Sequence, residues 1–95
     1  MEFEKLEPKK PREIIYVNSK EDLIKQFPEI SDIIEKMSDQ NLPEEEFKKI
    51  AHEYNNEADT PPGEVKRYSL NLKGDRVIEV CVGDDGRIGI NYELL

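Results

Sequence analysis

Residues 68–94 read YSLNLKGDRVIEVCVGDDGRIGINYEL, and this stretch decides the fold class. Apolar and polar residues alternate in three short runs, which is the period of a β-strand with one buried face. The connections KGD and GDDG are short and contain glycine, as hairpin turns require. The sequence therefore predicts three antiparallel C-terminal strands whose apolar face needs a cover. The apolar positions are Tyr68, Leu70, Leu72, Ile78, Val80, Val82, Ile88, Ile90, Tyr92 and Leu94.

Amphipathic helices within residues 19–58 are the only available cover. Ser19 is followed three residues later by Asp22, which is typical of a helix start. Pro28 lacks the amide that a helix interior needs, so it ends this first helix or begins another. PEEEFKKIAHEYNNEA, residues 43–58, predicts a further helix with its proline in the first turn. The apolar positions at helical spacing are Leu23, Ile24, Phe27, Ile30, Ile33, Ile34, Met37, Phe47, Ile50, Ala51, Tyr54 and Ala58.

One more strand is expected near the N-terminus, because EIIYV, residues 13–17, is β-branched and aromatic and too short for a helix of normal length. We therefore predict an α+β domain of two layers, with an antiparallel sheet of three or four strands covered by two or three helices. A chain of 95 residues is long enough for one such domain, which we assign to residues 13–95. Residues 1–12, MEFEKLEPKKPR, are expected to form a flexible arm, since they combine two prolines and alternating charge with few apolar residues.

The net charge of −8 is located in the middle of the chain. Residues 20–64 carry five lysines against thirteen acids, which gives 5 − 13 = −8. Residues 1–19 carry four bases against four acids, and residues 65–95 carry five against five, so both ends sum to zero. The predicted helices therefore hold most of the charge imbalance, and we expect a polarised molecule.

The residues that could carry catalysis or hold a metal do not form a recognised motif. His52 and Glu53 begin like the zinc-protease motif H-E-x-x-H, but Asn56 stands where the second histidine is required. Cys81 is the only cysteine, so it forms neither an internal disulfide nor a cysteine-based metal site. It lies in a predicted strand with no cationic cluster beside it in sequence to lower its pKa. GDDGR, residues 83–87, lacks the ligand set of a calcium or phosphate loop. We expect no enzyme activity, no metal and no cofactor.

Two further classes of partner are not favoured. Direct binding of nucleic acid is not expected, because the bases are scattered and offset by acids and the tyrosines belong to the apolar stripes. A membrane partner is not expected either, because no apolar run approaches the ~18 residues of a membrane span. The N-terminus is charged where a signal peptide would be apolar, which predicts a cytoplasmic protein, in the producing cell or in a host if the gene is viral.

The acidic helical layer is the remaining candidate site. A charged surface that keeps a small protein in solution needs no partner, and this interpretation stays open. The functional hypothesis is a non-catalytic inhibitor or regulator that docks on a basic surface of a protein such as a nuclease or a nucleic-acid-binding protein. Small acidic inhibitors, including bacterial immunity proteins, antitoxins and phage-encoded anti-defence proteins, are similar in size and charge, although no residue pattern matches one such family. The candidate contact residues are Glu44, Glu45, Glu46, Glu53 and Glu57.

Two other functions are weighed against this hypothesis, a mimic of duplex DNA and a subunit that assembles through a sheet edge. Residues 43–58 carry five acids against two lysines, net −3, over roughly 24 Å of helix. Duplex DNA of that length carries about 14 charges, so the helix is not a copy of a phosphate ladder. The alternative function is a small accessory subunit or homodimer that assembles through a sheet edge, since residues 92–95 are expected to end an exposed last strand.

Overall fold

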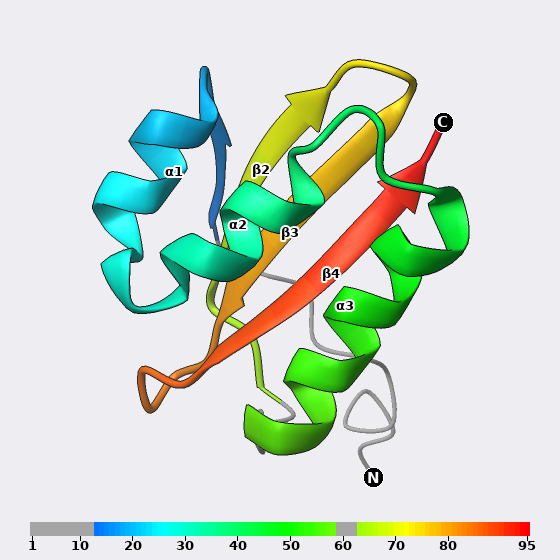
Figure 1. The fold of residues 1–95 in the computed structure, drawn as a ribbon. Coiled ribbons are helices and arrows are strands. Elements are labelled where there is room, and N and C mark those ends of the chain that lie inside the picture. Colours follow the sequence, from blue (N-terminus) through cyan, green and yellow to red (C-terminus); the bar gives the residue numbers. More distant parts are fainter. Residues whose placement is uncertain (1–12, 59–62) are drawn as a thin grey trace, which may run out of the picture.

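The computed structural model describes residues 13–58 and 63–95, and it confirms the predicted α+β class (Figure 1). The predicted arm, residues 1–12, lies outside the described residues. Three α-helices and one 3₁₀ turn stand between the first strand and the C-terminal meander, so the order is βαααβββ. The elements are β1 (Glu13–Val17), α1 (Lys20–Gln26), the 3₁₀ turn η2 (Pro28–Ile30), α2 (Ser31–Met37), α3 (Glu44–Ala58), β2 (Lys66–Leu72), β3 (Arg76–Val82) and β4 (Ile88–Leu94).

The four strands form one sheet in the order β1-β2-β3-β4. The meander of β2, β3 and β4 is antiparallel, as predicted from the two glycine-bearing turns. β1 lies beside β2 and runs parallel to it, in a register from Glu13 opposite Lys66 to Val17 opposite Leu70. Parallel neighbours need a long crossover connection, and the helices supply it here. The sheet is therefore mostly antiparallel with one parallel edge strand.

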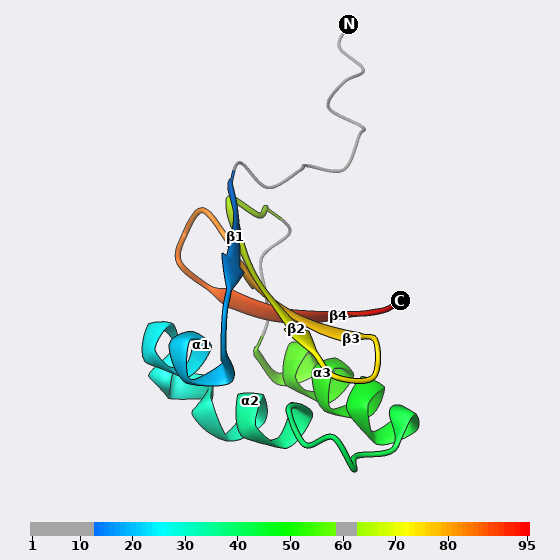
Figure 2. The same ribbon diagram turned by 90° about the horizontal axis from the view of Figure 1, so that it is seen from above.

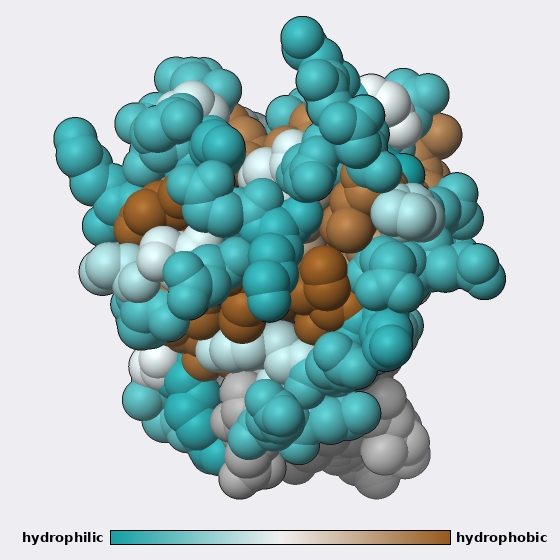
Figure 3. Space-filling model, in the orientation of Figure 1, coloured by the Kyte–Doolittle hydropathy of each residue, from teal (hydrophilic) through white to brown (hydrophobic). Residues whose placement is uncertain are grey.

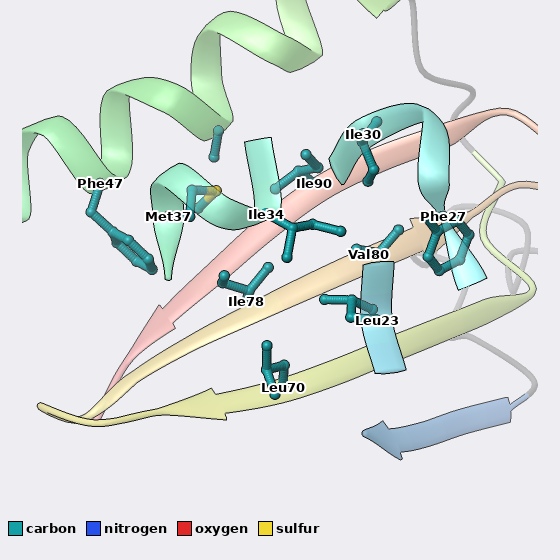
Figure 4. Close-up of a cluster of buried hydrophobic side chains, with 11 residues drawn as sticks. Leu23, Phe27, Ile30, Ile34, Met37, Phe47, Leu70, Ile78, Val80 and Ile90 are labelled. Carbon is teal, nitrogen blue, oxygen red and sulfur yellow. The ribbon is translucent and has the colours of Figure 1, made fainter. Parts of the chain in front are cut away.

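The helices all lie on one face of this sheet, which gives the predicted two layers (Figure 2). The core lies between the layers, and side chains from α1, α2 and α3 meet those of the three central and C-terminal strands (Figure 4). The buried core residues are Leu23, Phe27, Ile30, Ile34, Met37, Phe47, Ala51, Leu70, Ile78, Val80 and Ile90. All of them belong to the apolar positions that the helical and strand periods predict.

Local signals explain where the helices begin and end. The Ser19 hydroxyl accepts a hydrogen bond from the Asp22 amide at 3.2 Å, so Ser19 is the N-cap of α1. α1 ends at Gln26, and Pro28 then opens η2, as the missing proline amide requires. In the β2–β3 turn Gly74 and Asp75 have φ values of 81° and 62°, the left-handed region that tight hairpin turns use.

Candidate functional site

The two layers of the protein differ in charge. Residues 20–58, which form the helical layer, carry five lysines against eleven acids, and 5 − 11 = −6. Residues 13–17 and 63–95, which form the sheet layer, carry five bases against seven acids, and 5 − 7 = −2. Because the helices share one face of the sheet, the larger imbalance lies on one side of the molecule. Viewed from that side, most of the surface is hydrophilic, with apolar residues visible between the elements (Figure 3).

All five candidate glutamates lie on α3 with exposed side chains. Glu44 pairs with Lys48 at 3.2 Å, and Glu53 approaches Lys49 at 4.0 Å, so both belong to i,i+4 pairs along the helix. Such exposed pairs contribute little to stability. Within the described residues, Glu45, Glu46 and Glu57 have no ion-pair partner. Their charge is therefore available to solvent or to another molecule.

The structure brings three of these residues together and separates the other two. At roughly 100° per residue, Glu46, Glu53 and Glu57 fall on one side of α3. We call these three residues the glutamate stripe. Glu44 and Glu45 lie on other sides of the first turn, where carboxylates also favour the helix N-terminus electrostatically. The acids of the first turn thus have a structural role, whereas Glu53 and Glu57 are too far along the helix to share it.

The lone histidine belongs to an aromatic contact between α3 and β4. His52 Nε2 and Tyr92 Oη lie 3.4 Å apart, and the two rings meet edge to face with centroids 5.8 Å apart. Tyr92 also packs edge to face on Phe47, with ring centroids 5.7 Å apart. The Arg76 guanidinium lies over the Phe47 ring, 5.1 Å from its centroid. These contacts join the helix to the last strand. His52 therefore has a packing role at this contact.

Cys81 lies on the opposite side of the sheet from His52. Its neighbour Val80 points into the core, so Cys81 points away from the helices. The structure therefore does not bring the cysteine and the histidine together. Burial raises the pKa of the Cys81 thiol to about 12, and the nearby Glu64 carboxylate acts in the same direction. At neutral pH the thiol is protonated, which does not suit a nucleophile.

A charged cluster that the sequence analysis missed lies beside Cys81 on this face of the sheet. Arg67 donates two hydrogen bonds of 2.9 Å to the Glu64 carboxylate, and its Nη1 lies 3.5 Å from Oε1 of the buried Glu79. One cation, Arg67, stands beside Cys81 as its cross-strand partner, and no cationic cluster lowers the thiol pKa among the residues described. The attraction of Arg67 acts to lower the thiol pKa, but burial and the Glu64 carboxylate outweigh it.

The pKa values of the two carboxylates in this cluster, Glu64 and Glu79, are shifted in opposite directions. The hydrogen bonds from Arg67 hold the pKa of Glu64 below its usual value. Burial raises the pKa of Glu79, although the attraction of Arg67 partly offsets this shift. The Arg67 guanidinium thus gives Glu64 two hydrogen bonds and gives Glu79 one longer ion pair.

An open cleft of about 600 Å³ lies at the other end of β2. It is bounded by the β1–α1 connection, the C-terminal end of α2 and the β2–β3 hairpin. Lys20 and Glu35 pair at 2.9 Å in its wall, and Arg76, which also lines it, donates to the Leu42 carbonyl at 2.7 Å. The charged groups of this cleft include both signs, and two of its three bases already have partners. The cleft does not point to one class of ligand.

The two edges of the sheet are treated differently by the fold. At the β4 edge, the Asn55 side chain accepts from the Ile90 amide at 2.9 Å and donates to the Ile90 carbonyl at 2.7 Å. An amide from α3 therefore takes the place of a neighbouring strand. Asn55 thus occupies this edge at Ile90, and residues 92–95, where the alternative places assembly, lie beyond that contact. At the β1 edge, Ile14 and Tyr16 are 47% and 74% exposed.

A cluster of metal ligands and a membrane-spanning helix are both absent from the part of the chain that the structure describes. No three His, Cys, Asp or Glu side chains gather there in a way that would hold a metal ion. None of the described helices combines the length and the apolar character needed to cross a membrane.

Comparison with known proteins finds no matching family model, curated protein or solved structure. The function must therefore be argued from the surfaces of this chain alone.

Proposed function

We propose that this protein is a non-catalytic binding protein whose acidic helical layer docks on a basic surface of another protein and inhibits or regulates it. The observation that carries the proposal is the separation of charge between the two layers. The helical layer has a net charge of −6 and the sheet layer −2 over the described residues. A partner with a basic surface, such as a nuclease or a nucleic-acid-binding protein, is the matching chemistry.

Charge placed on one face orients a protein during encounter with an oppositely charged partner. Exposed charges act over about one Debye length, ~8 Å at physiological ionic strength. The glutamate stripe lies on the solvent side of α3, so it can approach a partner without any rearrangement of the core. Long-range attraction of this kind raises the association rate more than it raises affinity.

Glu53 and Glu57 offer the sharpest test of this surface. Reversing Glu44, Glu45 or Glu46 would also remove carboxylates from a helix N-terminus and weaken the helix itself. Lysines in the second half of α3 face the negative end of the helix dipole, which tolerates them. The double variant Glu53→Lys/Glu57→Lys changes the charge by 2 × 2 = +4 with little expected effect on folding.

The matched control makes the same change on the sheet layer. Asp84 and Glu93 are exposed acids of that layer, and Asp84→Lys/Glu93→Lys also changes the charge by 2 × 2 = +4. Wild type, helix variant and control are immobilised and used to capture basic proteins from the native cell. We expect one specific partner to be retained by the wild type and the control and lost by the helix variant. Equal retention by all three proteins would contradict docking through the helical layer.

A further inference from the structure

The hydrogen-bonding groups of β1 can be assigned to its two sides. The Glu13 amide donates to the Val65 carbonyl at 3.2 Å, next to the paired residues of β2. Backbone groups of successive strand residues point to alternate sides, so the N–H and C=O groups of Ile14 and Tyr16 point away from β2. No hydrogen bond within the described residues involves these outward groups.

The same two residues carry the exposed apolar side chains of this edge. Ile14 lies opposite Arg67 in the register and Tyr16 opposite Ser69, so both side chains belong to the sheet face without helices. Natural edge strands are usually protected by proline, lysine, a bulge or a covering element. β1 has none of the first three in EIIYV, whereas α3 protects β4 through Asn55. Within the described residues, no hydrogen bond occupies the outward groups of β1, so this edge is able to accept a strand.

We propose that β1 pairs with β1 of a second copy of this chain, antiparallel and centred on Ile15. In this register Ile14 of each copy lies opposite Tyr16 of the other, and these are the residues whose backbone groups point outward. Each such pair exchanges both N–H···O=C bonds, as a hydrogen-bonded pair of an antiparallel ladder does. The two sheets become one continuous sheet.

The sequence of β1 is self-complementary in this arrangement. Glu13 lies opposite Val17 of the other copy, so no like charges stand directly opposite each other. Ile14 and Tyr16 form aromatic and β-branched cross-strand pairs, a combination that stabilises sheets. Other registers that keep the outward groups paired shift the centre to Ile14 or Tyr16 and leave fewer strand residues in the ladder. The pairing uses no part of the acidic layer, so it stands or falls independently of the proposed function.

The first test compares proline substitutions at the two edges. Tyr16→Pro removes an outward amide of β1 and leaves the bonds of Glu13, Ile15 and Val17 to β2 in place. Leu94→Pro is the matched control, because Leu94 is outward-directed at the other edge, by the same alternation that directs Ile90 to Asn55. Sedimentation across concentrations should show a dimer for the wild type and Leu94→Pro. For Tyr16→Pro the dissociation constant should rise about tenfold or more.

The second test reads the register directly. Residues of a hydrogen-bonded antiparallel pair have Cα atoms ~5.5 Å apart, within the range that a disulfide spans. Ile14→Cys and Tyr16→Cys are each made in a Cys81→Ser background, and an equimolar mixture is oxidised. The mixture should form a disulfide-linked dimer, whereas each variant alone should not, because each cysteine then faces a non-cysteine residue. A monomer at all concentrations, or equal cross-linking in single and mixed samples, would overturn the proposal.

Discussion

At the scale of single residues, two side chains make contacts that their positions in the sequence do not predict. Asn55 lies in the polar part of a helix, yet it binds both backbone groups of Ile90 on the neighbouring strand. Arg67 lies in a strand and holds two carboxylates at once. Asn55 thus pairs two partly buried backbone groups, and Arg67 gives the buried Glu79 its ion-pair partner.

Replacing Asn55 should weaken the contact between α3 and β4. Asn55→Ala leaves the Ile90 amide and carbonyl, both partly buried, without their partners, and we expect a loss of about 1–2 kcal/mol in the free energy of unfolding. Asn56→Ala is the control on the same helix, since Asn56 is exposed. Urea unfolding measures both. Equal midpoints for the two variants would show that Asn55 does not hold the edge.

The carboxylates around Arg67 should give opposite pH dependences. Glu64 has a lowered pKa, so its contribution to stability is present at neutral pH and lost as the pH falls through its folded-state pKa. Glu79 has a raised pKa, so its contribution is largest at acid pH and declines as the pH rises through its folded-state pKa.

Glutamine substitutions separate these two effects. Glu64→Gln should destabilise the protein at pH 7, and the difference from the wild type should shrink towards acid pH. Glu79→Gln should have its most favourable effect, relative to the wild type, at neutral pH. Thermal unfolding of both variants between acid and neutral pH measures the two slopes. Parallel pH profiles for both variants would contradict the assigned shifts.

At the scale of elements, the hydrophobic period predicts which segments are helices and strands and which faces they bury. The hairpin turns also imply the register of β2 and β3, in which Arg67 meets Cys81 and Ser69 meets Glu79. The charged cluster could therefore have been predicted from this register, because it places Arg67 beside Cys81 and near Glu79. The parallel placement of β1 and the contact of Asn55 with Ile90 depend on how helices pack in three dimensions, which spacing along the chain does not encode.

The orientation of β3 is tested by placing a charge on its buried face. Val80 is fully buried in the core, so Val80→Asp brings in a carboxylate without a partner and should unfold the domain. Asn71→Asp, at an exposed position of the neighbouring strand β2 opposite Val77, should leave the fold intact. Circular dichroism and the thermal midpoint distinguish the two. A midpoint for Val80→Asp near that of the wild type would mean that the assigned face is wrong.

At the scale of the whole molecule, the fold converts a charge excess in the middle of the chain into a charge difference between two layers. The helical layer, residues 20–58, brings eleven acids and five lysines to one face of the sheet. The other side carries the Arg67 cluster and the open edge of β1. Binding of a basic partner and pairing of β1 would therefore use different surfaces.

The measurement that tests the central claim most directly is the association rate with the captured partner as a function of salt. The Debye length falls from ~30 Å at 0.01 M to ~8 Å at 0.15 M ionic strength, so the long-range attraction to an acidic layer weakens over this range. We predict that the wild type associates about tenfold faster than Glu53→Lys/Glu57→Lys at low salt and that its rate falls more steeply as salt rises. The control Asp84→Lys/Glu93→Lys should follow the wild type more closely. Equal rates and equal salt slopes for the wild type and the helix variant would contradict the claim that the helical layer is the docking surface.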